Sequence, residues 1–243
     1  DEIKGLRDKF EHDATGLVAQ NAVANNALSK VTLSRKLLQT SLNEFFSVNL
    51  DQGGMPATNQ KDSGRCWMFG TLNLFRFGTR DKLKVDDFEF SESYLYFYYL
   101  LEQTNWFLEY MISSSTRPLD DREVSEVMGS PIADGGDWGI AVNLIQKYGL
   151  VPKPAYPESH TSSHTSELMD RMTLMLSSFG YQIRTTLQDG GSVEEAREIK
   201  QLCVRNAHRI LCIHLGTPPG SFVWQFCNGD DDDCDGSTDE DYA

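Results

Sequence analysis

Hydrophobic residues recur at helical intervals along most of the chain, and short stretches rich in glycine, proline or aspartate interrupt them. Residues 15–47 mix small apolar and polar residues with this spacing, which predicts helix. Residues 51–56 break the pattern and indicate a turn. A second helix is predicted over about residues 64–79, where Phe69 and Leu72 share one face. The first third of the chain is therefore expected to be largely helical.

Capping residues locate the next two helices. Ser91 precedes a stripe of large apolar residues, and a serine there accepts hydrogen bonds from the free N–H groups at a helix start. Asp137 is expected to cap a further helix that ends at Gly149. The stripe after Ser91 is typical of a buried face and consists of Tyr94, Leu95, Phe97, Tyr98 and Leu101.

The remainder of the chain alternates irregular and helical segments. Residues 117–121 indicate a polar turn, and three prolines within residues 151–157 predict an extended linker without regular structure. Residues 164–179 are expected to be helical. Residues 192–213 are expected to form one helix or a helix pair, with Ser192 as its cap.

Charge is distributed unevenly over the 243 residues. The net charge is −14, and residues 227–243 carry eight acids and no lysine or arginine, which leaves −6 for residues 1–226. We therefore divide the chain into a body, 1–226, and an acidic tail, 227–243. With 40% hydrophobic residues the body is expected to be globular, and it shows neither a basic patch for nucleic acid nor an apolar run long enough to cross a membrane.

Cys66 is the strongest candidate for chemistry. It stands directly before a helical apolar run, so its thiol is expected at a helix start, where free N–H groups and the helix dipole favour the nucleophilic thiolate. Gln60 precedes it by six residues, and its amide together with the Cys66 N–H would form a two-donor oxyanion hole. The alternative is a buried structural cysteine. The Gln60 spacing and the adjacent Trp67 favour the nucleophile.

These motifs resemble one known family. The pattern Gln-x5-Cys-Trp and the segment 134–138, within a similarity that runs from about residue 15 to residue 226, resemble the bleomycin hydrolase branch of the papain-like cysteine peptidases, which includes bacterial aminopeptidases. The resemblance implies an α+β papain-like fold, of which this chain holds mainly the helical, nucleophile-bearing half. It implies thiolate attack on a peptide carbonyl, an acyl-enzyme and aminopeptidase action.

Gly135 and Gly136 form the candidate substrate-binding segment, and Trp67 is assigned to the same site. Paired glycines let a peptide approach the backbone closely because no side chain intervenes. The resemblance implies that this segment hydrogen-bonds the substrate main chain beside the cysteine. The alternative is a flexible turn before the Asp137 cap.

The base that a thiol nucleophile requires has no evident candidate. None of the five histidines stands in a segment resembling the family's catalytic histidine region, and no Asn-Ser-Trp stretch is present; the histidines are His12, His160, His164, His208 and His214. His160 and His164 are expected in a polar loop. We therefore expect a cysteine peptidase that lacks its base, so that this chain alone is inactive. The alternative is a non-catalytic domain that binds peptide or calcium.

The resemblance also implies the partners and the compartment. It implies a peptide substrate, no cofactor for catalysis, a homo-oligomer that is a hexamer in the family, and a cytoplasmic location. The chain begins at Asp1 without an initiator methionine, which indicates a removed leader or an incomplete sequence.

The acidic tail suggests a different property. Asp231, Asp233 and Asp235 alternate before a glycine, which is the arrangement of oxygen ligands that a Ca²⁺ loop requires, although the bidentate glutamate of an EF-hand is missing. The tail resembles a short motif of some secreted bacterial proteins, so a secreted location is the alternative to the cytoplasmic one. Cys227 and Cys234 would close a small disulfide loop only in an oxidising compartment. The alternative is a solvated acidic extension. Cys203 and Cys212 are expected to be buried free thiols.

Overall fold

The computed structural model of the chain describes residues 2–32, 34, 55–85 and 87–224. It divides into two compact units, Asp1–Asp51 and Gln52–Ala243. The predicted boundary between body and tail, the three tail aspartates and the Cys227–Cys234 pair lie outside the described residues.

The first unit consists of short helices whose apolar side chains are not buried. Its helices are α1 (Glu2–Glu11), α2 (Ala14–Asn25) and α3 (Leu28–Val31), and none of them buries a residue. The Asp13 carboxylate caps α2 by accepting the Thr15 N–H at 3.1 Å. The helical prediction for residues 15–47 is confirmed as far as Val31, and residues 35–47 lie outside the described part of the chain.

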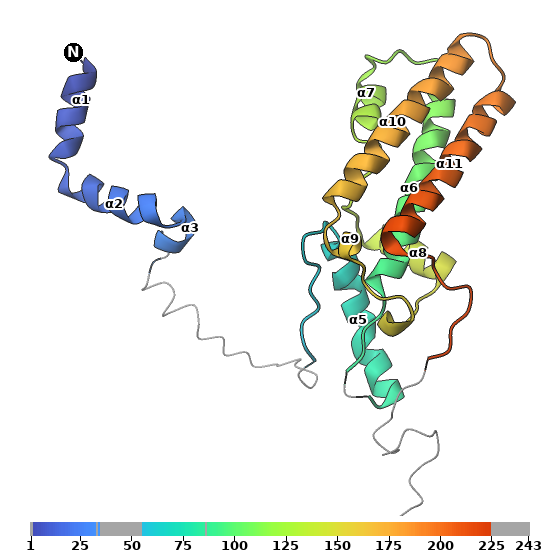
Figure 1. The fold of residues 1–243 in the computed structure, drawn as a ribbon, viewed down its shortest axis with the longest axis horizontal. Helices are drawn as coiled ribbons and strands as arrows, with labels where there is room; N and C mark the ends of the chain where they lie inside the picture. Colours follow the sequence, from blue (N-terminus) through green and yellow to red (C-terminus); the bar gives the residue numbers. More distant parts are fainter. Residues whose placement is uncertain (1, 33, 35–54, 86, 225–243) are drawn as a thin grey trace, which may run out of the picture. The chain divides into compact units, whose positions relative to one another are not determined.

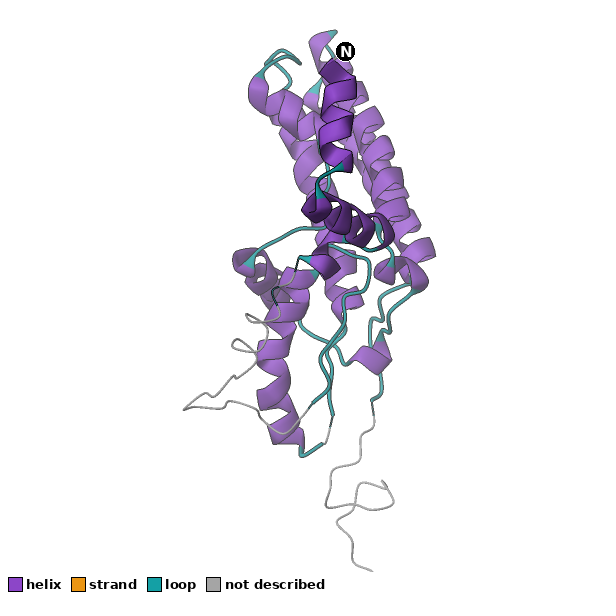
Figure 2. Cartoon of the chain, turned by 90° about the vertical axis from the view of Figure 1, so that its left-hand side faces the viewer, coloured by secondary structure: helices purple, strands orange, loops and turns teal. Residues whose placement is uncertain are grey.

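Three long helices form the centre of the second unit. Helices α6 (Glu92–Ser113), α10 (Ser166–Gln188) and α11 (Val193–Leu215) pack side by side, and α5 (Cys66–Leu83) and α8 (Trp138–Tyr148) pack against the first part of α6 (Figure 1). Shorter elements complete the unit: α7 (Arg122–Gly129), η1 (Lys153–Ala155) and α9 (His160–Ser163). Figure 2 shows the same helices from the side, without a strand in the described part.

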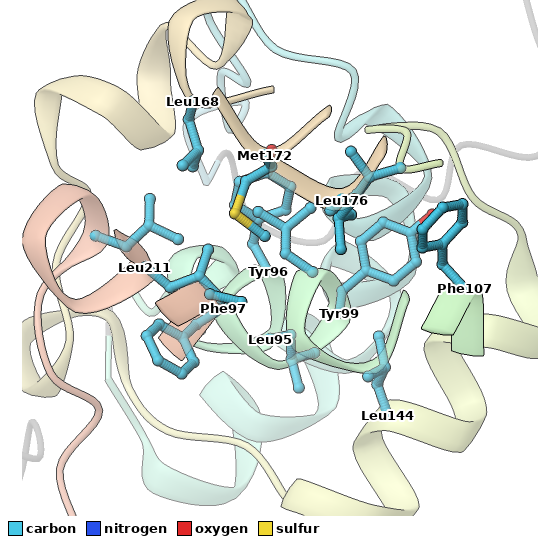
Figure 3. Close-up of a cluster of buried hydrophobic side chains, with 14 of the residues drawn as sticks. Leu95, Tyr96, Phe97, Tyr99, Phe107, Leu144, Leu168, Met172, Leu176 and Leu211 are labelled. Atoms are coloured by element: carbon cyan, nitrogen blue, oxygen red, sulfur yellow. The ribbon is translucent and has the colours of Figure 1, made fainter. Parts of the chain in front are cut away.

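The core fills the space between these long helices. Tyr96 and Phe97 of α6 meet side chains of α10 and α11, whereas Leu95 points to the side on which Leu144 of α8 lies (Figure 3); each of the three is at most 1% exposed. Burying one such side chain stabilises the fold by roughly 1.5–3 kcal/mol. The aromatic stripe predicted after Ser91 is thus a core face, although Tyr98 and Leu101 are only half-buried.

The predicted helix caps are confirmed. The Ser91 hydroxyl accepts the Tyr94 N–H at 3.1 Å, and the Asp137 carboxylate accepts the Ile140 N–H at 3.0 Å. Gly149 ends α8 with a φ of 74°, a conformation that favours glycine. Ser192 caps α11 in a reciprocal pair with Glu195. Because α11 runs without a break from Val193 to Leu215, the segment predicted as one helix or a helix pair is one helix.

Three local predictions were wrong. Residues 151–157 contain the 3-10 turn η1, because proline fixes a φ that also suits the start of such a turn. His160 lies in the helical turn α9, which Ser159 and Ser162 cap reciprocally, and not in a loop. Helix α10 continues beyond residue 179 to Gln188, because Gly180 allows close packing on α6: a Cβ there would lie 2.8 Å from the Phe107 ring.

The described residues contain little β-bridge pairing. It consists of two isolated bridges, a parallel one between Asp62 and His164 and an antiparallel one between Phe90 and Pro152. The helical character of the predicted half is therefore confirmed, and the sheet of an α+β fold does not occur in residues 2–32, 34, 55–85 and 87–224. No helix in these ranges combines the length and apolarity needed to span a membrane.

Candidate active site

The loop before Cys66 is built by local hydrogen bonds. The Ser63 hydroxyl donates to the Gln60 carbonyl at 2.7 Å, and the Gln60 amide donates to the Ser63 carbonyl at 2.6 Å. Between them Lys61 has a φ of 56°, a left-handed conformation that costs a non-glycine residue on the order of 1 kcal/mol. The Asn59 side chain supports this turn by accepting the Lys61 N–H at 2.8 Å. The loop thus holds a strained backbone next to the candidate nucleophile.

Arg65 anchors the end of this loop inside the protein. It is fully buried, and its guanidinium donates two hydrogen bonds to the Glu158 carboxylate at 3.0 and 2.7 Å. The same group lies over the rings of Phe69 and Tyr96, 5.1 and 5.2 Å from their centroids. A paired and stacked arginine of this kind fixes the direction in which the chain enters α5. Neither Arg65 nor Glu158 is predicted as a site residue from the sequence, because the two lie 93 positions apart.

Cys66 is the first residue of α5, as predicted, and its side chain is exposed. Its backbone N–H is one of the helix-start donors that have no acceptor within the helix. Among the described residues its thiol has no hydrogen-bond partner. The structure therefore presents a free thiol to solvent at a helix N-terminus, and the alternative of a buried structural cysteine is wrong.

The glycine segment lies against the residue that follows Cys66. The Trp67 indole N–H donates to the Asp134 carbonyl at 2.9 Å. A Cβ on Gly136 would lie 2.6 Å from the Trp67 ring, so only glycine fits there, whereas a Cβ on Gly135 would meet nothing within 4 Å. The Tyr99 hydroxyl donates to the Gly135 carbonyl, and its ring stands edge-on to Trp67 at 4.9 Å. Both glycines are exposed.

Helices α6 and α8 border a cavity that begins near this segment. Its volume is about 530 Å³, and Tyr99, Gln103, Trp106 and Tyr148 are among its lining residues. The Gln103 side chain also exchanges two hydrogen bonds with the backbone of Ala133, at 2.8 and 3.1 Å. The residues before the glycines are therefore anchored to α6 on the cavity side.

The histidines have partners other than Cys66. Four histidines form hydrogen bonds through a ring nitrogen with a nearby residue. His12 bonds to the Asp8 carbonyl, His164 to the His160 carbonyl, His208 to the Cys212 sulfur and His214 to the Thr161 hydroxyl. His160 stacks on His164, with ring centroids 4.4 Å apart. In the described part of the chain, none forms a hydrogen bond with the Cys66 thiol.

Metal binding has no support in this part of the molecule. Over residues 2–32, 34, 55–85 and 87–224, no group of three or more His, Cys, Asp or Glu side chains converges as a metal site would require. The predicted Ca²⁺ ligands Asp231, Asp233 and Asp235 lie outside these ranges.

An exposed cysteine at the start of a long helix, with a glycine segment packed on the following tryptophan, is an arrangement suited to a thiol nucleophile. A family model described as the Peptidase C1-like family matches residues 1–238, and the chain belongs to that family. The match confirms the predicted resemblance and extends beyond residues 15–226 at both ends.

Individual relatives agree with this assignment. The chain is 39% identical over 220 residues to the aminopeptidase C of Lactobacillus delbrueckii subsp. lactis, which covers 90% of this chain and 48% of that protein. It is 33% identical over 232 residues to human bleomycin hydrolase, covering 95% of this chain and 51% of the relative. The chain thus spans about half the length of the curated relatives it matches.

A solved structure shows the same fold. The crystal structure of PepW from Lactobacillus rhamnosis, determined as the selenomethionine derivative, matches with a TM-score of 0.82 and 34% identity over 96% of this chain and 51% of that one. The fold of the chain is therefore that of a large part of a papain-like peptidase.

Proposed function

We propose that this chain is the nucleophile-bearing part of an aminopeptidase-type cysteine peptidase whose complete fold is α+β. The observation that carries the proposal is the exposed Cys66 thiol at the N-terminus of α5, one residue from the tryptophan on which Gly136 packs. The relatives named aminopeptidase C and bleomycin hydrolase support the choice of reaction.

The proposed reaction is acyl transfer through Cys66. The Cys66 sulfur gives up its proton to a base and attacks the peptide carbonyl carbon, and the carbonyl electron pair moves onto oxygen. When the oxyanion collapses, the C–N bond breaks and the amine leaves with the proton from the base. Water then attacks the resulting thioester, which releases the carboxylic acid and restores the thiol.

Two donors are proposed to hold the oxyanion: the Cys66 backbone N–H and the Gln60 side-chain amide. One amide hydrogen of Gln60 is bound to the Ser63 carbonyl, and the second has no partner among the described residues. A single donor of this kind contributes on the order of 10²-fold or more to the rate.

The glycine segment is proposed to bind the substrate main chain. Gly135 and Gly136 are exposed and carry no side chains, so an extended peptide can approach their backbone. Trp67 supports them by packing under Gly136. Peptides bound in this way gain main-chain hydrogen bonds without selecting particular side chains.

The base is proposed to be a group other than the five histidines of this chain, because four of them are hydrogen-bonded elsewhere and the ring of His160 stacks on His164. The chain by itself should then hydrolyse peptides slowly. Family resemblance supports four further proposals: a peptide as substrate, catalysis without a cofactor, a cytoplasmic location and hexameric assembly. A Ca²⁺ site at Asp231, Asp233 and Asp235 is proposed on sequence spacing alone.

Alkylation with matched reagents tests the proposal. A chloromethyl ketone reacts when the thiolate sulfur displaces chloride and forms an S–C bond, and it needs no separate base. The rate at Cys66 is compared for an N-acetyl dipeptidyl chloromethyl ketone and for chloroacetone, which has the same reactive group without a peptide. Two main-chain hydrogen bonds should make the peptidyl reagent about tenfold faster relative to its rate with a free thiol. Equal relative rates would refute peptide binding at this site.

A further inference from the structure

Asp134 lies where four separate segments of the second unit meet. Its carboxylate accepts the Gly64 N–H at 3.1 Å and also accepts hydrogen bonds from the hydroxyls of Tyr96 and Thr165. Its main-chain carbonyl accepts the Trp67 indole N–H at 2.9 Å. One residue therefore joins the loop before Cys66, the first turn of α5, the α6 core and the start of α10.

The space around this carboxylate is shaped for it. A Cβ on Gly64 would lie 2.5 Å from the Asp134 Cβ, so the glycine permits the close approach of the two chains. Tyr96 is fully buried, and burial together with the Asp134 charge raises the pKa of its phenol well above its usual value. The phenol therefore stays protonated and donates its hydrogen to Asp134.

We propose that Asp134 is a positioning residue that sets the distance between the Cys66 thiol and the Gly135–Gly136 segment, an inference that rests on the proposed peptide-binding role of that segment. Gly64 precedes Cys66 by two residues, and Gly135 follows Asp134 directly, so one carboxylate links the nucleophile to the substrate backbone. A displacement of about 1 Å between reacting groups can cost on the order of 10²-fold in rate. Asp134 itself has no role in the bond-making steps.

Three substitutions separate this role from simple structural support. Asp134→Ala removes the carboxylate. Asp134→Asn keeps an acceptor for the Gly64 N–H and offers its amide hydrogens to hydroxyls that also accept, so it should restore the geometry. Ser114→Ala is the matched control, because the Ser114 hydroxyl also forms buried hydrogen bonds, with Arg184 and the Tyr110 carbonyl, but at the opposite end of α6.

Two measurements are made on the whole chain. Hydrogen exchange by mass spectrometry follows residues 61–66 and 133–137, and alkylation gives the ratio of the peptidyl chloromethyl ketone rate to the chloroacetone rate at Cys66. In Asp134→Ala both segments should exchange about tenfold faster, as the loss of about one hydrogen bond predicts, and the ratio should fall toward that of a free thiol. Asp134→Asn should restore most of both values, and Ser114→Ala should change neither.

Each contrary outcome has a distinct meaning. Unchanged exchange in Asp134→Ala overturns the inference, because the two segments are then held together without the carboxylate. Faster exchange with an unchanged, high ratio also overturns it, because the residue is then structural and does not position the site. A wild-type ratio equal to that of a free thiol overturns the proposed peptide binding, and the positioning role with it.

Discussion

At the scale of single residues, the three described cysteines occupy different environments. Cys66 is exposed at a helix start, Cys212 is half-buried beside His208 at 3.7 Å, and Cys203 is fully buried. Burial raises the pKa of the Cys203 thiol to about 12, because the apolar surroundings disfavour the thiolate. The prediction that Cys203 is a buried free thiol is confirmed, and the same prediction for Cys212 was wrong in its degree of burial.

These environments predict an order of thiol reactivity. Iodoacetamide at neutral pH should label Cys66 first and Cys203 last, because Cys66 is exposed, whereas Cys203 is inaccessible and its burial disfavours the thiolate. Mass spectrometry of timed digests measures the order. In denaturant the differences should disappear, which is the control for folding. Labelling of Cys66 no faster than Cys203 in the folded chain would contradict a preorganised nucleophile.

The two glycines of the candidate site offer a matched pair of substitutions. Gly136→Ala should destabilise the chain by about 1–3 kcal/mol, because the new methyl group would overlap the Trp67 ring. Gly135→Ala should change stability by less than about 0.5 kcal/mol, since its Cβ position is open. Urea unfolding of both variants measures the difference. Equal effects would show that Gly136 and Trp67 are not packed as described.

At the scale of secondary-structure elements, a buried cation joins α10 to the end of α6. The Arg184 guanidinium donates to the Ser114 carbonyl at 2.8 Å, to the Ser114 hydroxyl at 3.0 Å, and to the Arg117 carbonyl. These carbonyls lie just past the C-terminus of α6, where the helix dipole favours a positive charge. This contact explains why α10 extends past the end that the hydrophobic pattern predicted.

Replacing Arg184 should lower the free energy of unfolding. Arg184→Met should destabilise the chain by about 3 kcal/mol, because it removes the three hydrogen bonds that this buried, charged donor makes to Ser114 and Arg117. Arg171→Met on the same helix is the control, since Arg171 pairs with Glu167 on the surface and should contribute less than about 0.5 kcal/mol. Chemical denaturation compares the two. A small effect of Arg184→Met would mean that apolar packing alone holds α6 and α10 together.

Elements differ in how far the sequence predicts them. The caps at Ser91, Asp137 and Ser192 depend on neighbours within three residues, so local chemistry was sufficient to place them. The C-terminal end of α10 depends on Gly180 meeting Phe107 and on Arg184 meeting Ser114, contacts that join residues about 70 positions apart. A local hydrophobic pattern contains no information on such contacts.

At the scale of the whole molecule, a buried acid links stability to pH. Glu92 is 1% exposed, and burial raises its pKa from 4.5 to about 7, while Lys153 nearby opposes the shift. Between these values the folded state holds a proton that the unfolded state has lost. Stability therefore falls as the pH rises from about 4.5 to about 7.

Glu92→Gln should remove this dependence. At pH 5 the variant and the wild type should have similar free energies of unfolding. At pH 8 the variant should be more stable by on the order of 2–3 kcal/mol, because the wild type must then bury a charge. Urea unfolding at both pH values gives the difference, in which the titration of all other groups cancels. A difference that does not change with pH would show that Glu92 ionises normally in the folded chain.

Turnover is also a property of the whole molecule. If the base is a group outside this chain, as proposed, the chain alone should hydrolyse an aminoacyl aminocoumarin several orders of magnitude more slowly than a complete cysteine peptidase. A residual rate from binding and the oxyanion donors then remains on the order of 10³-fold over water. Fluorescence release measures it. Robust activity that Cys66→Ala abolishes would contradict the proposal and would identify one of the five histidines as the base.

The sequence by itself determined the family, the helical half of the fold and the position of Cys66 at the start of a helix, because each follows from contiguous residues with diagnostic local chemistry. It did not predict Arg65–Glu158 or Asp134, whose partners are 93 and up to 70 positions away. Only the tertiary structure decided these contacts and the meeting of Trp67 with Gly136, because a buried charge or a close approach depends on which distant segments the packed core brings together.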